Sequence, residues 1–169
     1  MMARRPETGH RTGATPAITV ALEAEIEHRV HTYEHDPAVG NYSQEAAEAM
    51  AVPPERVLKT LLADSGSGLV VGIVPVTAIL DLKALARAVA AKRVTLAEAD
   101  VAERATGYVV GGISPLGQRA SYPTVLDMSA ARFSTIFVSA GRRGMEIELS
   151  ATDLMVLTNA GLADIGRDG

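Results

Sequence analysis

Residues 57–76 read VLKTLLADSGSGLVVGIVPV and indicate the centre of the fold. Two apolar runs flank the short segment SGSG at residues 65–68. Such runs, separated by a glycine-containing loop, predict two antiparallel strands joined by a hairpin. Lys59 is a charged residue inside the first run. Because an unpaired buried ammonium is costly, Lys59 either reaches the edge of the sheet or meets an anionic or polar ligand, and the sequence leaves both alternatives open.

Helices are predicted on both sides of this hairpin from their capping residues. A Ser, Thr or Asp before an apolar helical stripe can accept a hydrogen bond from the first free backbone N–H groups, and glycine often follows the last helical turn. The main helices are predicted to start at Thr15 followed by Pro16, at Asp81, at Thr95 with the capping-box partner Glu98, and at Ser150, and the last two are predicted to end at Gly107 and Gly161. A short helix is predicted after Ser43, and a single helical turn at Pro53-Pro54.

Further strands are expected after residue 107. They lie at YVVGG, TVLDM, STIFVSA and MEIELSA, residues 108–112, 124–128, 134–140 and 145–151. Strands and helices therefore mix without strict βαβ alternation, which predicts an α+β fold with a mixed, barrel-like sheet core and surrounding helices. At this length we expect one domain over residues 15–169, preceded by a disordered tail at residues 1–14.

Composition excludes several classes of protein. The chain has 16 Lys and Arg against 20 Asp and Glu, a formal charge of −4, which argues against binding nucleic acid through a broad basic surface but allows a local basic pocket. It has no cysteine, so a disulfide, a thiolate nucleophile and a cysteine zinc site are excluded. No apolar run could cross a membrane and no secretory signal is present, so we expect a cytoplasmic protein.

The histidines do not predict a metal or a catalytic base. All four lie in the first 35 residues, and on a strand His28 and His31 face opposite sides, so that only His31 and His35 share one. No second ligand cluster completes a metal shell, and we expect no cofactor. The chain has neither a G-x-S-x-G elbow nor a later histidine to serve a nucleophilic serine.

Two glycine-rich segments have both a structural and a functional interpretation. Residues 111–117, GGISPLG, fit a plain turn or a backbone that approaches a ligand closely, and they match neither common nucleotide-phosphate motif. Residues 141–144, GRRG, fit an exposed hairpin tip or an anion clamp. The residues alone favour the turn and the tip.

Five separated motifs together resemble the YbaK/EbsC family, in order and from about residue 14 to the C-terminus. They are HTYEHDP at 31–37, KTLL at 59–62, DLKALARA at 81–88, TGYVVGGISPLGQ at 106–118 and FVSAGRRGMEIEL at 137–149. This resemblance implies an enzyme that hydrolyses the ester of a wrong amino acid on tRNA. It also implies a relation to the editing domain of bacterial prolyl-tRNA synthetases.

The resemblance also assigns residues. The lysine of KTLL is implied to meet the 3′ end of the tRNA acceptor, and residues 111–115 match a G-x-x-x-P loop whose backbone N–H groups surround the ester. The implied catalytic residues are Lys59, Gly111, Gly112 and Ser114, and the implied substrate-binding residues are Tyr33, Pro115, Gly117, Ser139, Gly141, Arg143, Gly144 and Glu146. Arg142 and Glu146 depart from a close relative within that family, which has a lysine and an aspartate at these positions.

The chemistry implied by the resemblance needs no protein nucleophile. The substrate is expected to be Cys-tRNA(Pro), with Cys-tRNA(Cys) as a second candidate, and its own thiol attacks the ester while fixed backbone donors stabilise the oxyanion. Prolyl-tRNA synthetase is the expected partner. Two alternatives remain open, namely a deacylase for Ala-tRNA, Ser-tRNA or another aminoacyl-tRNA that uses water, and a non-catalytic adaptor that binds tRNA or the synthetase.

Overall fold

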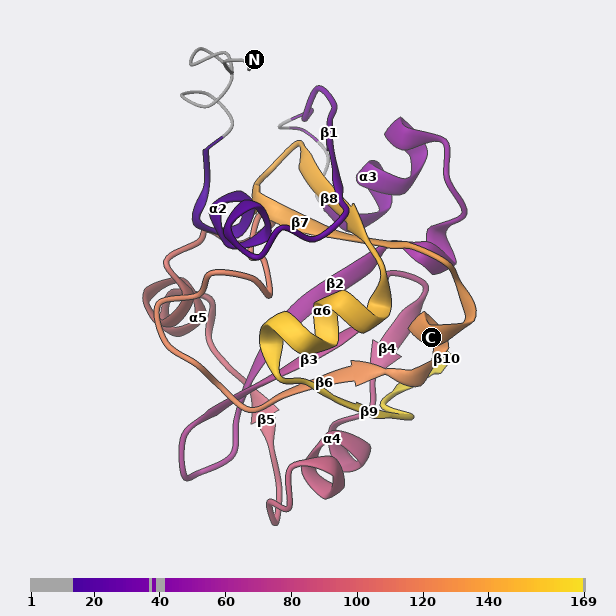
Figure 1. Ribbon diagram of the computed structural model, residues 1–169. Helices are drawn as coiled ribbons and strands as arrows, with labels where there is room; N and C mark the ends of the chain where they lie inside the picture. The colour runs from indigo at the N-terminus through magenta and orange to yellow at the C-terminus, as the bar shows by residue number, and fades with distance from the viewer. Residues whose placement is uncertain (1–13, 37, 39–41, 169) are drawn as a thin grey trace.

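The computed structural model describes residues 14–36, 38 and 42–168 (Figure 1). The predicted disordered tail lies outside these residues, except for Ala14. Within them the chain forms five α-helices and three β-sheets, which confirms the α+β prediction. The expected barrel-like core is an open set of sheets and not a closed barrel. No helix in the described ranges is both long and apolar enough to cross a bilayer.

The predicted hairpin forms the middle of the largest sheet. Strands β2(Leu58–Asp64) and β3(Leu69–Pro75) pair antiparallel over their full length. Asp64 accepts a hydrogen bond from the Gly66 N–H at 2.8 Å, and the Ser65 N–H donates to the Gly68 carbonyl at 2.9 Å. These local bonds fix the tip of the turn, and so they also fix the register of the two strands.

The other strands extend this sheet in the order β5-β2-β3-β6-β9. Strands β6(Thr124–Asp127) and β9(Gly161–Ala163) are added in parallel, whereas β5(Thr95–Leu96) runs antiparallel to β2. Because β5 pairs only with Ala63 and Asp64, the first half of β2 lies at the edge of the sheet. The candidate site lies along this edge.

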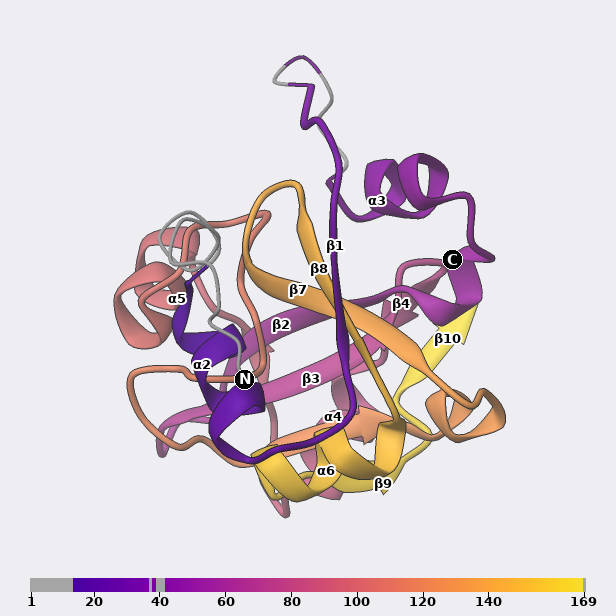
Figure 2. The ribbon, with the colours of Figure 1, turned by 45° about the horizontal axis from the view of Figure 1, so that its top comes forward.

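A second sheet crosses above the first. It consists of β1(Arg29–Thr32), β8(Met145–Leu149) and β7(Ile136–Arg142), all antiparallel neighbours (Figure 2). An isolated bridge between Val57 and Phe137 joins it to the start of β2. The third sheet is the short pair β4(Ala78–Leu80) and β10(Gly166–Asp168).

Side chains of β2 and β3 alternate between two apolar clusters. Leu58, Leu62 and Ile73 pack between the two larger sheets, together with helices α2(Pro16–Glu23) and α6(Ala151–Thr158). Ala63 and Val74 face the other way, toward helix α4(Leu82–Ala88). Since a fully buried Leu or Ile contributes roughly 2 kcal/mol, this two-sided burial holds the central hairpin rigidly beneath the site.

The predicted caps at Thr15, Asp81 and Ser150 are confirmed, whereas the helix predicted to begin after Ser43 already begins at Tyr42. The side chains of Thr15, Asp81 and Ser150 each accept a hydrogen bond from the backbone N–H three positions later in the chain, at 3.0–3.1 Å. The short segments η1(Pro54–Arg56) and η2(Met128–Arg132) are 3₁₀ turns. Helix α3(Tyr42–Met50) packs beside η1.

The predicted helix cap at Thr95 is wrong. Thr95 pairs with Asp64 in strand β5, so it cannot cap the helix, and helix α5(Ala99–Thr106) begins after Glu98 without a side-chain cap. This helix does end at Gly107, as predicted, with φ of 85°.

Two other local predictions are also wrong. Residues 108–112 are a turn and not a strand, because Val109 and Val110 are 51% and 36% exposed and the chain bends at Gly111. Helix α6 ends at Asn159 in the left-handed conformation, before Gly161, which begins strand β9.

Candidate functional site

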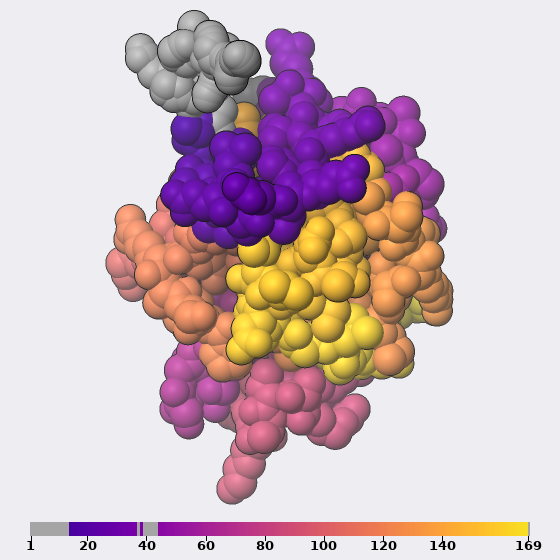
Figure 3. All heavy atoms as spheres, viewed as in Figure 1, coloured from indigo at the N-terminus to yellow at the C-terminus, as the bar shows by residue number. Residues whose placement is uncertain are grey.

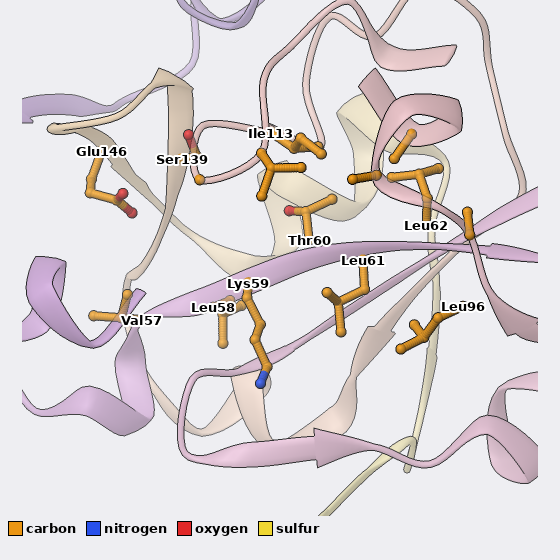
Figure 4. Close-up of a pocket in the computed structure, with 15 residues that line it drawn as sticks. Val57, Leu58, Lys59, Thr60, Leu61, Leu62, Leu96, Ile113, Ser139 and Glu146 are labelled. Atoms are coloured by element: carbon orange, nitrogen blue, oxygen red, sulfur yellow. The ribbon is translucent and has the colours of Figure 1, made fainter. Parts of the chain in front are cut away.

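A pocket of about 540 Å³ lies along the open edge of β2. Strand β2 forms one wall, strand β5 and helix α5 form the second, and the loop after α5 meets strands β7 and β8 at the third (Figure 4). Its lining residues are Val57, Leu58, Lys59, Thr60, Leu61, Leu62, Leu96, Ala97, Ala99, Ala102, Val110, Gly111, Ile113, Ser139 and Glu146. The pocket is therefore apolar at its base, with a few polar groups that converge on it.

Four of the twelve sequence-predicted site residues line this pocket. They are Lys59, Gly111, Ser139 and Glu146. Ser139 and Glu146 lie directly opposite each other on the paired strands β7 and β8, which places both side chains on the same face of that sheet. Residues from three distant parts of the sequence thus meet in one cavity.

Glu146 has the most strongly shifted pKa among the residues that line the pocket. Its side chain is only 6% exposed, and it makes no hydrogen bond to any described residue. Burial raises the pKa of this carboxyl from 4.5 to about 8. At neutral pH it is therefore mostly protonated, and it can donate a hydrogen bond as well as accept one.

Lys59 lines the pocket from the other face of β2. Its side chain is half-buried, and burial lowers its pKa. Figure 4 shows its ammonium on the side of the strand opposite Thr60, Ile113 and Ser139. Adjacent strand residues alternate in this way, so Thr60 and not Lys59 faces the glycine loop in this conformation.

Thr60 is a polar group that the sequence interpretation missed. Its Oγ1 is buried and has no hydrogen-bond partner among the described residues. In Figure 4 the side chain points toward Ile113 and Ser139. A buried hydroxyl without a partner is costly, so its presence at the pocket wall suggests that a ligand supplies the missing bond. Its place beside Lys59 in KTLL was the only signal available in the sequence.

The glycine loop contributes two pocket-lining residues whose backbone N–H groups are unused in the described chain. In the described chain, the N–H groups of Gly111 and Ile113 donate no hydrogen bond, and both residues line the cavity. Gly111 has φ of 91°, a conformation that glycine adopts without strain. The N–H of Gly112, by contrast, donates to the Val109 carbonyl at 2.8 Å and is already used.

The glycines also let this loop pack tightly against the β7–β8 turn. A Cβ on Gly112 would lie 2.9 Å from the backbone of Arg142 and Arg143, and one on Gly141 would lie 2.7 Å from the Tyr108 ring. Arg143 Nε donates to the Val110 carbonyl at 2.9 Å across the same contact. The predicted residues Gly112, Gly141 and Arg143 therefore fix the loop and do not line the pocket.

Other predicted residues are also structural in their placement. Ser114 is fully buried, and its Oγ accepts from the Leu116 N–H at 3.2 Å within the loop. Pro115 is buried in the same loop, and Gly117 lies against helix α2, where a Cβ would be 2.7 Å from the Pro16 backbone. None of the three lines the pocket.

Tyr33 and Gly144 form a contact beside the pocket. The Tyr33 N–H donates to the Gly144 carbonyl at 2.9 Å, and a Cβ on Gly144 would lie 2.7 Å from the Tyr33 carbonyl. Burial, followed by the nearby carboxyls Glu146 and Glu45, raises the pKa of Tyr33 to about 12. Tyr33 is therefore an electrostatic neighbour of Glu146, outside the lining itself.

His31 in strand β1 and His35 just after it each contact a carboxylate. His31 Nε2 lies 2.9 Å from Glu148, and His35 Nδ1 lies 2.9 Å from Glu45. Among the described residues, no three or more His, Asp or Glu side chains are grouped so that they could hold a metal. The first pair connects β1 to β8, and the second connects the segment after β1 to α3.

Comparison with known proteins places this geometry in a family. Residues 36–157 match the family model of the aminoacyl-tRNA editing domain. "Putative Cys-tRNA(Pro)/Cys-tRNA(Cys) deacylase EbsC" of Enterococcus faecalis is 36% identical over 155 residues, which are 89% of this chain and 94% of that protein.

Two solved structures share the fold. The hypothetical protein APE2540 superposes with a TM-score of 0.82 at 21% identity, over 90% of this chain and 100% of that one. A structure described as a "putative trans-editing enzyme for prolyl tRNA synthetase" superposes with a TM-score of 0.77 at 22% identity, over 98% and 99% of the two chains. Given the match in sequence over most of its length, the chain belongs to the aminoacyl-tRNA editing domain family, as the YbaK/EbsC resemblance indicated.

Proposed function

We propose that this protein is a trans-editing hydrolase that removes cysteine from Cys-tRNA(Pro). The observation that carries the proposal is a pocket lined by Gly111, Ile113, Glu146 and Thr60, where two backbone N–H groups, a buried carboxyl and a buried hydroxyl have no hydrogen-bond partner among the described residues. The relative from Enterococcus faecalis, whose name includes the same reaction, supports the choice of substrate.

The ester carbonyl is placed against the glycine loop. The N–H groups of Gly111 and Ile113 are then the donors that meet the carbonyl oxygen as it gains negative charge. Because the loop is held by its contacts with Arg142 and Arg143, these donors need no reorganisation during attack. Loss of one such donor typically slows a reaction by about 100- to 1000-fold.

The attacking atom comes from the substrate. The pocket offers the hydroxyls of Ser139 and Thr60, but no histidine lies among its lining residues to activate them. The cysteine thiol instead attacks its own carbonyl carbon. A sulfur–carbon bond forms, the ester carbon–oxygen bond breaks, and the thiol proton passes to the departing ribose oxygen, so that a thiolactone and free tRNA leave. Such an intramolecular nucleophile has a high effective concentration. Water then opens the thiolactone to cysteine, which completes the hydrolysis.

The remaining polar groups position the amino acid. Protonated Glu146, with Ser139 opposite and Thr60 across the cavity, offers hydrogen bonds to the amino and thiol groups of cysteine. Lys59 binds the phosphate of the terminal nucleotide, on the side of β2 away from the ester. Prolyl-tRNA synthetase is the proposed partner that delivers the tRNA, which is supported by the description of the structural neighbour.

Deacylation of defined mischarged tRNAs tests this proposal. We expect the purified protein to release cysteine from Cys-tRNA(Pro) and to leave Ala-tRNA(Pro) intact, since alanine has no thiol. Lys59→Ala is expected to slow the reaction at least tenfold, whereas Arg132→Ala, at an exposed position away from the pocket, serves as a control for the loss of one positive charge. Rapid loss of both substrates would replace thiol attack with water attack, and equal activity of Lys59→Ala and wild type would remove Lys59 from the mechanism. Binding of aminoacyl-tRNA without release above the buffer rate would indicate an adaptor.

A further inference from the structure

Four exposed cationic side chains gather on and after helix α4. Lys83 and Arg87 are one turn apart on the helix, and Lys92 and Arg93 follow in the segment that leads to β5. No acidic residue occurs from residue 82 to residue 97, although the whole chain has more acidic than cationic side chains. The local charge is therefore opposite in sign to that of the chain. We call these four residues the cationic cluster.

The cationic cluster surrounds a single hollow of about 320 Å³. Within the described part of the chain, none of its members forms an ion pair. Like charges that are held together without counterions repel one another, and a polyanion relieves this repulsion. In Figure 3 the segment around α4, drawn in pink, projects from the lower end of the molecule, where a large partner can reach it.

The cationic cluster extends along the chain toward the candidate pocket. Lys92 and Arg93 also line a second hollow of about 530 Å³, which has Thr95 at its margin. The next residue, Leu96, lines the candidate pocket itself. The acidic residue among the lining of these two hollows is Asp64, whose carboxylate accepts the turn hydrogen bond from Gly66. The two hollows at the cationic cluster share Lys92 and Arg93, and strand β5 separates them from the candidate pocket by one residue.

Lys59 lies on the same face of the sheet as helix α4. Its neighbour Leu61 packs in the cluster around helix α4, and Figure 4 shows both side chains on one side of β2. From Lys59 to Asp64 the strand advances about 17 Å at roughly 3.4 Å per residue. This length equals the rise of about five stacked nucleotides at roughly 3.4 Å each. An acceptor strand with its terminal phosphate at Lys59 would therefore bring a phosphate about five nucleotides away to Asp64, where Lys92 and Arg93 line the same hollow.

We infer that the cationic cluster binds the phosphodiester backbone of the tRNA acceptor arm, and so aligns the 3′ end with the pocket; this inference rests on the proposed function. Contacts to phosphates position a nucleic acid without reading its sequence. The cluster therefore supplies affinity for the acceptor arm in general. Discrimination between tRNAs is then left to the pocket and to a partner protein.

The test measures binding of uncharged tRNA(Pro) as a function of salt, which does not depend on catalysis. Each neutralised phosphate changes the slope of log affinity against log salt by roughly 0.7 to 0.9. We expect Lys92→Gln/Arg93→Gln to bind more weakly than wild type at 50 mM salt. Between 50 and 200 mM salt, wild-type affinity should fall roughly tenfold more than that of the variant. Lys83→Gln/Arg87→Gln should show a change of the same sign.

A matched control removes two exposed arginines from other surfaces. Arg29→Gln/Arg132→Gln changes the net charge by the same amount and should keep the wild-type slope. If the cluster variant and this control have equal slopes, the cationic cluster does not contact the phosphates. The rate of hydrolysis of cysteinyl-adenosine, which has the ester but no phosphate, separates the two proposals. If the wild-type protein binds tRNA but cleaves neither Cys-tRNA(Pro) nor cysteinyl-adenosine, the proposed function is rejected and the binding result stands.

Discussion

Replacing Glu146 by glutamine should remove a large pH dependence of stability. The folded protein holds this carboxyl with a pKa raised from 4.5 to about 8, because its 6% exposed side chain is desolvated. Between these two values the folded state binds a proton that the unfolded state has released. The free energy of unfolding must therefore decrease as pH rises from about 4.5 to about 8.

The size of the stability change follows from the difference between the folded and unfolded pKa values of Glu146. A pKa difference of this size corresponds to about 5 kcal/mol, an upper value because local relaxation and water entry reduce it. Below pH 4.5 the carboxyl is neutral in both states, and its full contribution to stability is present. Above pH 8 that contribution is lost. Glu146→Gln keeps the shape of the side chain but cannot ionise, so the variant should be the more stable protein at pH 9.

Urea unfolding at pH 5, 7 and 9 measures this effect. We expect wild type and Glu146→Gln to have similar free energies of unfolding at pH 5, and to diverge by several kcal/mol at pH 9. Glu55→Gln makes the same chemical change at an exposed position and controls for general charge effects. Parallel pH curves for wild type and Glu146→Gln would refute the reasoning, because they would show that Glu146 ionises equally in both states.

Two further substitutions test the walls of the pocket. Gly112→Ala should lower the free energy of unfolding by about 1–3 kcal/mol, measured by urea midpoint, since its Cβ would lie 2.9 Å from the backbone of Arg142 and Arg143. Gly161→Ala, with no atom within 4 Å of the added Cβ, is the control, and equal losses for the two would contradict the predicted clash. Thr60→Val should raise the free energy of unfolding by about 1 kcal/mol, because it removes a buried hydroxyl without a partner, while it weakens deacylation. A loss of stability in this variant would mean that the hydroxyl is satisfied in the folded protein.

The sequence predicts the centre of the fold well because its signals are local. The hairpin at residues 57–76 follows from two apolar runs and a short glycine turn, and the caps at Thr15, Asp81 and Ser150 follow from hydrogen bonds that span three residues. Thr95 shows the limit of such signals. Its pairing with Asp64, more than thirty positions away, prevails over its local preference to cap a helix.

The site is less predictable because it depends on long-range placement. A charged residue in strand β8 is visible in the sequence, but only the register of β7 and β8 puts Glu146 opposite Ser139. The sequence singles out the glycine loop, and in the structure its glycines are placed differently. Gly111 lines the pocket, whereas Gly112 allows the loop to touch the β7–β8 turn. Spacing along the chain cannot separate these two roles.

The polar wall of the pocket is hard to explain by stability alone. A buried carboxyl and a buried hydroxyl that have no partner among the described residues each destabilise a fold by about 1–3 kcal/mol, and an apolar side chain of similar size would avoid that cost at either position. Both groups face one cavity, together with two backbone donors that have no partner in the described chain. A packing defect and a binding site then differ in one respect. An apolar substitution that fills a packing defect improves stability without loss of activity. At Glu146 or Thr60, an apolar substitution of similar size should stabilise the protein and impair deacylation.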